Sequence, residues 1–250
     1  MRFVTEGEAF VSGRFGLQRR CVNVLCAAVG AVLSVVPSMA LAHGVTAGDK
    51  GYIMETFGIR LVPFMYLGAK HMVTGYDHLL FLVGVIFYLY RLKDIGVYVT
   101  LFALGHSITL IAGVLGDVRV NAYLIDAVIG ASVAYKALDN LGSLERWFRR
   151  PPDPRTMTMA FGLLHGLGLA TKMIDFDLAK AGLVPNLLAF NVGVELGQFL
   201  ALAVILIAIS YWRRTVSFVR YANAANVGLL LSGVALVMYQ VAGYLASTQA

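Results

Sequence analysis

Long apolar runs follow one another along most of this 250-residue sequence, and they restrict the chain to few folds. Each run is close to the roughly 20 residues that a helix needs to cross about 30 Å of hydrocarbon. Hydrophobic residues make up 59% of the chain and charged residues only 14%, a balance that excludes a soluble domain of this size. The sequence predicts an all-α integral membrane protein. Its six runs are 75–91, 96–115, 121–142, 156–173, 184–212 and 222–246.

The first 42 residues have the pattern of a signal peptide. Arg14, Arg19 and Arg20 precede an apolar stretch at 22–36, and Ala40-Leu41-Ala42 matches an A-x-A cleavage site. We expect cleavage before His43, whose free amine and imidazole could then chelate a metal at the outer surface; an uncleaved signal anchor is the alternative. Both cysteines lie in residues 1–42, so the mature chain offers no disulfide and no thiolate ligand.

Residues 43–74 form an extracytoplasmic or re-entrant segment in this prediction, and 75–250 a single transmembrane helical domain. The stretch 51–73 is too polar for a comfortable span. With six spans, the basic loops between the runs all face the cytoplasm, whereas a seventh span at 51–73 would turn them outward. The positive-inside rule therefore favours six helices in a bacterial inner membrane with the mature N-terminus outside. The net charge of +6 comes largely from these loops and does not indicate nucleic-acid binding.

Ionisable side chains inside the apolar runs are the candidate functional groups. A titratable group in hydrocarbon costs several kcal/mol, so it usually has a partner and a function. At about 1.5 Å per helical residue, these groups lie about 4 to 16 Å from the outer end of their runs. In order of depth they are His78, Asp126, His165, His106 and Glu195.

A His-x5-Asp-His element lies where the first run begins. His71 and His78 are seven residues apart, so one continuous helix would place them on one face, although Gly75 could break it. Asp77 could bind the metal itself, or it could fix the tautomer of an imidazole by hydrogen bonding to the ring nitrogen that does not bind the metal. Nitrogen and oxygen donors exclude a thiolate site and leave the ion open among nickel, cobalt, zinc, manganese, iron and copper.

Each of these residues also has a structural interpretation. A single intramembrane histidine is often a hydrogen-bonded packing residue, and Asp126 could accept a hydrogen bond from Tyr123 or from a neighbouring helix. Lys136 and Asp139, three residues apart, are best explained as an ion pair. Taken together, however, the histidines and acids outnumber the basic residues that could neutralise them, which predicts bound cations or protons.

Four motifs resemble the HupE/UreJ family of hydrogenase- and urease-associated membrane proteins, from about Gly68 to the last run. They are Thr74-Gly-Tyr-Asp-His-Leu-Leu-Phe-Leu82, Leu104-Gly-His-Ser-Ile-Thr-Leu110, Phe161-Gly-Leu-Leu-His-Gly-Leu-Gly168 and Phe190-Asn-Val-Gly-Val-Glu-Leu-Gly-Gln198. The resemblance implies a nickel or cobalt permease of about six helices, with His71, Asp77 and His78 in the metal-associated element. His106, His165 and Glu195 fall in its other motif blocks.

A divalent transition-metal permease is therefore the leading hypothesis, with the lipid bilayer and the metal ion as partners. No nucleotide-binding G-x-x-x-x-G-K-[ST] motif occurs, so an ion gradient, the membrane potential or trapping would drive transport. Three alternatives remain open. They are an intramembrane metal-dependent enzyme, a b-type cytochrome with His106 and His165 as axial ligands, and a metal-delivery subunit that associates with a metalloenzyme or its assembly machinery.

Overall fold

The computed structural model describes residues 58–174 and 182–249, and every regular element within them is a helix. The predicted signal peptide and His43 lie outside the described residues. The helices are α3 (Leu61–Thr74), α4 (Tyr76–Ile86), α5 (Leu92–Leu115), α6 (Ala122–Asn140), α7 (Ser143–Trp147), α8 (Pro154–Ile174), α9 (Leu183–Arg213) and α10 (Val216–Gln249).

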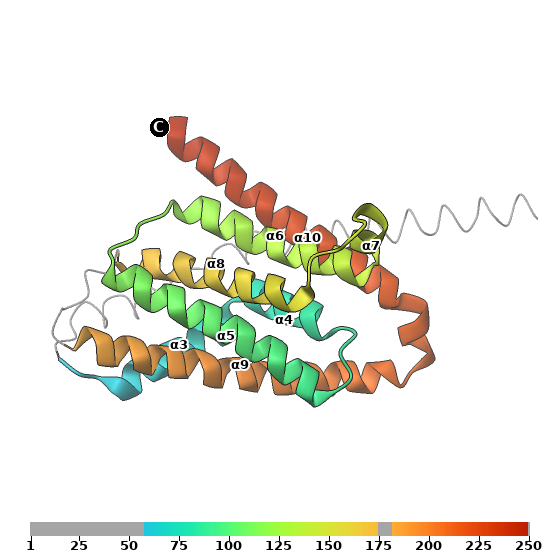
Figure 1. Ribbon diagram of the computed structural model, residues 1–250, viewed down its shortest axis with the longest axis horizontal. Helices are drawn as coiled ribbons and strands as arrows, with labels where there is room; N and C mark the ends of the chain where they lie inside the picture. Colours follow the sequence, from blue (N-terminus) through green and yellow to red (C-terminus); the bar gives the residue numbers. More distant parts are fainter. Residues whose placement is uncertain (1–57, 175–181, 250) are drawn as a thin grey trace, which may run out of the picture.

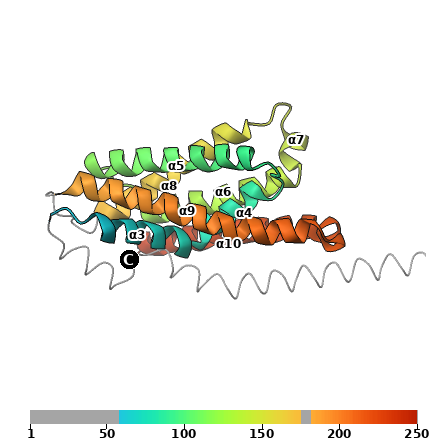
Figure 2. The same ribbon diagram turned by 90° about the horizontal axis from the view of Figure 1, so that it is seen from below.

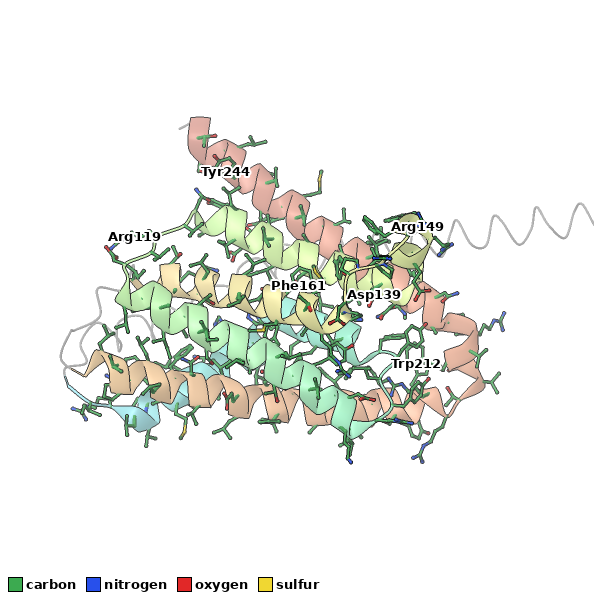
Figure 3. The ribbon with its side chains drawn as sticks, viewed as in Figure 1. Arg119, Asp139, Arg149, Phe161, Trp212 and Tyr244 are labelled. Atoms are coloured by element: carbon green, nitrogen blue, oxygen red, sulfur yellow. The ribbon has the colours of Figure 1, made fainter. Side chains whose placement is uncertain are left out.

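The long helices run back and forth along one common direction (Figure 1). The short helix α7 marks one end of the bundle, which we call the α7 end. Arg149 and Trp212 lie at this end, whereas Arg119 and Tyr244 lie at the opposite end (Figure 3). Two of the basic loops, 143–155 and 211–220, are therefore at the α7 end. They lie on the same side of the bundle, as expected for six passes.

In the part of the chain that the structure describes, four helices are long and apolar enough to cross a membrane: Leu92–Leu115, Pro154–Ile174, Leu183–Arg213 and Val216–Thr248. Helix α6 has the length of a span but carries Asp126, Lys136 and Asp139. Five of the six apolar runs recognised in the sequence each correspond to one helix, whereas the run 75–91 is helical only to Ile86. The described part of the chain is thus an all-helical, multi-pass membrane protein.

The stretch 51–73, expected at the outer surface or as a re-entrant segment, contributes most of its described residues to α3. Helix α3 lies along α9 at the edge of the bundle (Figure 2). Helix α3 ends at Thr74, Gly75 has an extended ψ of 95°, and α4 begins at Tyr76. The two short helices therefore act as one broken pass, and the predicted boundary between residues 74 and 75 is the break within it.

Glycines bring the helices into pairs at backbone contact. A Cβ on Gly193 would lie 1.9 Å from the carbonyl oxygen of Met65, which sets the approach of α3 to α9. A Cβ on Gly162 would lie 2.3 Å from the carbonyl oxygen of Phe102. Only a glycine at this position allows α5 and α8 to come so close. The Gly-xxx-Gly steps seen in the sequence are thus sites of close helix contact, as small residues are in membranes.

Arg213 secures the inner half of the broken pass. Its guanidinium donates to the backbone carbonyls of Ile86, Phe87 and Leu89, just where α4 ends. The last carbonyls of a helix have no intrahelical partner, and a cation there also complements the helix dipole. The end of α9 thereby holds α4 in place, although α4 has only three turns of its own.

Candidate metal centre

Four histidines from four different helices meet in the middle of the bundle. His78 of α4 is central: its ring centre lies 5.3 Å from that of His71 on α3, 6.5 Å from His106 on α5 and 5.0 Å from His165 on α8. His78, His106 and His165 are almost fully buried. The expected convergence of imidazoles from separate helices is therefore present, and we call these four residues the histidine cluster.

Asp77 fixes the tautomer of His78. Its Oδ1 lies 2.8 Å from His78 Nδ1 and also accepts the backbone N–H of His78 at 2.9 Å. Because a carboxylate accepts hydrogen bonds, the proton of the neutral ring sits on Nδ1 and the lone pair on Nε2. Carboxylates commonly orient metal-binding histidines in this way. This contact fits the orienting role for Asp77, one of the two roles that the sequence left open.

Ser132 of α6 fixes the tautomer of His165 by the same logic. Its hydroxyl donates to the carbonyl of Ile129 at 2.7 Å, so its oxygen must accept from His165 Nε2 at 3.2 Å. A serine hydroxyl has only one proton to donate. The lone pair of His165 is therefore on Nδ1, and both His78 and His165 present a defined basic nitrogen.

Buried ring nitrogens without hydrogen bonds point to a further ligand. Among the described residues, neither Nδ1 nor Nε2 of His106 has a partner, and Nε2 of His71 has none either. A buried polar atom that lacks a partner costs about 1–3 kcal/mol, so native structures keep few of them without a reason. A cation that accepts nitrogen lone pairs would remove this cost.

A small cavity of about 20 Å³ adjoins the histidine cluster. That volume holds about one water molecule or one ion. The cavity is lined by His71, Gly75, Asp77, His78, Asp126, Ile129, His165, Gly168, Leu169 and Lys172.

The side chains do not form a finished coordination sphere. Within residues 58–174 and 182–249, no three His, Asp or Glu side chains stand in positions that could hold one metal ion together. The ring centre of His78 is nevertheless 5.0 to 6.5 Å from those of the other three histidines, and imidazoles that share an ion at about 2.0–2.1 Å have ring centres separated by roughly 4.5 to 6.5 Å. The histidine cluster must therefore rearrange before its nitrogens can bind one ion together.

Lys172 neutralises Asp126, which the sequence argument did not foresee. Its ammonium lies 2.9 and 3.0 Å from the two oxygens of Asp126, and both residues line the cavity. The expectation that basic residues were too few to neutralise the acids was wrong for Asp126. A signal was available: Lys172 follows His165 by seven residues, which places both on one face of α8.

Glu195 lies away from the histidine cluster. It is exposed on α9 and lines a second cavity together with residues of α5, none of them histidine. Counting residues along the helix placed Glu195 near the middle of a pass. Such a count does not say toward which neighbour the side chain points. The Lys136–Asp139 pair expected from the sequence is present at 2.5 Å.

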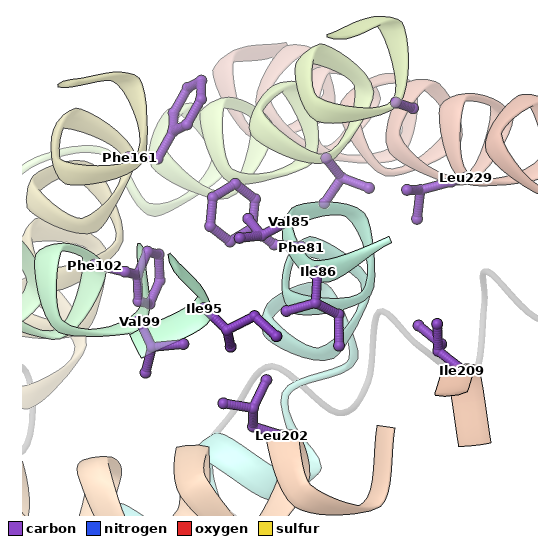
Figure 4. Close-up of a cluster of buried hydrophobic side chains, with 12 residues drawn as sticks. Phe81, Val85, Ile86, Ile95, Val99, Phe102, Phe161, Leu202, Ile209 and Leu229 are labelled. Carbon is purple, nitrogen blue, oxygen red and sulfur yellow. The ribbon is translucent and has the colours of Figure 1, made fainter. Parts of the chain in front are cut away.

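Three phenylalanines close the cluster toward the α7 end. Phe81 follows His78 by three residues, and Phe102 and Phe161 precede His106 and His165 by four. Because α4 runs opposite to α5 and α8, all three lie one turn nearer the α7 end (Figure 1). They pack together with Val85 and other buried apolar residues (Figure 4). The histidine cluster is therefore separated from the α7 end by an apolar barrier.

Fold and site together define a class: a multi-pass helical membrane protein with a buried histidine cluster at its centre. The chain belongs to the HupE / UreJ protein family, whose pattern matches residues 47–248. No curated protein and no solved structure matches the chain. The family match covers all four helices of the histidine cluster.

Proposed function

We propose that this protein is a permease for a divalent transition-metal ion, which binds at the histidine cluster while it crosses the membrane. Membership of the HupE / UreJ family favours nickel or cobalt as the transported ion. The observation that carries the proposal is His106, a fully buried imidazole with two ring nitrogens that lack hydrogen bonds, 6.5 Å from His78. Imidazole nitrogen is a ligand that nickel, cobalt and zinc all accept.

The arrangement around the cluster supports passage rather than permanent storage. The ammonium of Lys172 is paired with Asp126 and lies next to the cavity. Its positive charge repels a metal ion in the cavity and so weakens the binding of that ion. A transported ion must be bound strongly enough to lose water but weakly enough to leave. The phenylalanine barrier at Phe81, Phe102 and Phe161 would have to move for the ion to reach the α7 end.

We place the protein in the bacterial inner membrane with the α7 end in the cytoplasm. The basic loops 143–155 and 211–220 lie at this end, which is the side that positive charge favours. In this orientation the ion enters from the end where α3 begins, meets the histidine cluster, and is held back by the phenylalanine barrier.

Uptake into proteoliposomes tests the function. Purified full-length protein should accumulate at least one of nickel, cobalt, zinc, manganese or copper above protein-free vesicles, and His165→Ala should abolish the difference. Asn226→Ala is a suitable control, because Asn226 is equally buried but bonds Asn140 away from the cavity. Tight binding without any flux would instead support delivery of metal to another protein, and uptake that survives His165→Ala would refute the assigned site.

Asp77→Asn should weaken metal binding by about 10- to 100-fold. An amide is a poorer acceptor than a carboxylate, so His78 becomes less basic and its orientation less certain. Equilibrium binding of nickel and zinc to the purified protein measures the effect. Asp139→Asn is the matched control, because Asp139 pairs with Lys136 and does not line the cavity. Equal losses in the two variants would contradict the orienting role of Asp77.

Lys172→Gln should raise the affinity for a divalent ion by at least roughly tenfold, because a positive charge next to the site is removed. The metal-free protein should become less stable, since Asp126 is then buried without its ion pair. The double variant Asp126→Asn/Lys172→Gln should recover stability but lose the gain in affinity. Calorimetric titration and thermal unfolding of the three proteins check both statements.

A further inference from the structure

The second cavity, which Glu195 lines, is a groove of about 180 Å³ between α5 and α9 with a mostly apolar lining. Its polar side chains are Thr100 and Ser107 from α5 and Glu195 and Gln198 from α9. The remaining lining residues are Val99, Ala103, Leu104 and Phe199. The lining of the groove thus carries one acidic group and no basic group.

Gln198 shows that this groove is built to receive something polar. It is 1% exposed, and among the described residues neither its Oε1 nor its Nε2 has a hydrogen-bond partner. A buried primary amide offers two donors and an acceptor, so leaving both atoms unused is costly. Gln198 lines the groove, so a ligand there could satisfy the amide once the side chain turns its polar atoms toward it.

Among the described residues, no ion pair neutralises Glu195. It lies about 18 Å from the first residue of α9, near the middle of the pass. Around it on the same helix, Val192, Leu196 and Phe199 are half exposed, which is the composition of a lipid-facing surface. An ionised carboxylate in such surroundings is costly unless it is paired.

We propose that this groove binds a monovalent alkali cation such as sodium, held by the Glu195 carboxylate and the Oε1 of Gln198. These two residues are three apart and so are neighbours on one helix face. Carboxylate, amide carbonyl and hydroxyl oxygens are the ligands that hard cations prefer. A single positive charge neutralises the single carboxylate, whereas a divalent ion would leave a net charge in hydrocarbon.

The hydroxyls of α5 supply further oxygen atoms. Thr100 and Ser107 are two helical turns apart, about 10 Å, so one ion can reach only one of them. Because α5 and α9 run in opposite directions, Ser107 lies at the Glu195 end of the groove (Figure 1). The volume leaves room for several waters to complete the coordination of the cation. A proton would need neither this space nor these additional oxygens.

This cation site is independent of the histidine cluster, and only its use as a driving ion would rest on the proposed function. A chain without a nucleotide-binding motif needs another energy source, and an alkali-ion gradient would provide one. The test is therefore made on binding, with metal affinity measured separately. In this way, the failure of one proposal does not count against the other.

Thermal unfolding of the full chain in lipid nanodiscs, free of transition metals, tests the site. Sodium chloride at roughly ten times the dissociation constant should raise the melting temperature by about 3–5 °C over choline chloride at equal ionic strength. Potassium and lithium chloride rank the selectivity. Glu195→Gln should abolish the shift, and Gln198→Leu should reduce it. Gln240→Leu is the matched control, because Gln240 is also a buried glutamine but lies on α10.

Direct binding of radioactive sodium to the wild-type protein gives a second readout in case a variant fails to fold. The proposal is overturned by an equal sodium shift in Glu195→Gln, by no difference between sodium and choline, or by no saturable sodium binding. It is also overturned if acidification alone reproduces the shift, since a proton is then the occupant. A wild-type dimer that Glu195→Gln dissociates would show instead that a second copy of the chain covers the groove.

Discussion

A His78→Ala variant should bind divalent transition metals about 100- to 1,000-fold more weakly than the wild-type protein. Four ligands to a structural zinc ion together contribute about 10–16 kcal/mol, so one ligand accounts for roughly a quarter of that. His78 is the central residue of the cluster, with three other imidazoles 5.0 to 6.5 Å away. We therefore expect the loss to exceed that of Asp77→Asn. Titration calorimetry with nickel, cobalt and zinc measures it.

His78→Asn separates loss of a ligand from loss of packing. The asparagine amide can still donate to Asp77 from about the position of Nδ1, but it has no equivalent of Nε2. Metal affinity should fall as far as in the alanine variant, while thermal stability should fall less, because Asp77 keeps a partner. If His78→Asn bound metal as well as the wild type does, Nε2 of His78 would not be a ligand.

Gly166→Ala should destabilise the protein by about 3 kcal/mol or more. The added methyl group would lie 2.1 Å from the carbonyl oxygen of His106 and 2.3 Å from Oγ1 of Thr109. Thr109 in turn donates to the Leu163 carbonyl at 2.6 Å, so α5 and α8 are joined at this point. The helices would have to separate, which moves His106 away from the cluster. We thus expect weaker metal binding as well as a lower melting temperature.

Gly228→Ala is the control for this prediction. Nothing lies within 4 Å of a Cβ at Gly228, and the residue is inside α10. Alanine is the better helix former by about 1 kcal/mol, so this variant should be neutral or slightly more stable. Thermal unfolding under the same conditions compares the stabilities of Gly166→Ala and Gly228→Ala. Similar stabilities would mean that the contact between α5 and α8 is less tight than the structure indicates.

Much of the architecture follows from composition along the chain. The apolar runs at 96–115, 156–173 and 184–212 became α5, α8 and α9 because a backbone in hydrocarbon must satisfy its own hydrogen bonds. The broken first pass was harder to predict. Helix α3 is polar enough to resemble a surface segment, and its place beside α9 depends on glycine contacts such as Gly193 against Met65. Contacts of this kind are not visible in one segment alone.

The candidate site was predictable in part. His78, His106 and His165 were identified because each is a costly group at a similar depth in an apolar run, and depth follows from counting residues. Asp126 and Glu195 met the same criterion, but Asp126 is paired with Lys172 beside the cluster and Glu195 faces a separate groove. Counting residues gives the height of a side chain in the bilayer but not its direction around the helix.

The sequence by itself determined that this chain is a helical membrane protein with titratable groups held at mid-depth. Hydrophobic runs and their lengths are local properties, and the cost of a buried imidazole does not depend on its neighbours. Only the tertiary structure decided which groups meet. The rotation of each helix is set by its packing against other helices, so the histidine cluster, the Asp126–Lys172 pair and the Glu195 groove arise only when all of them are in place.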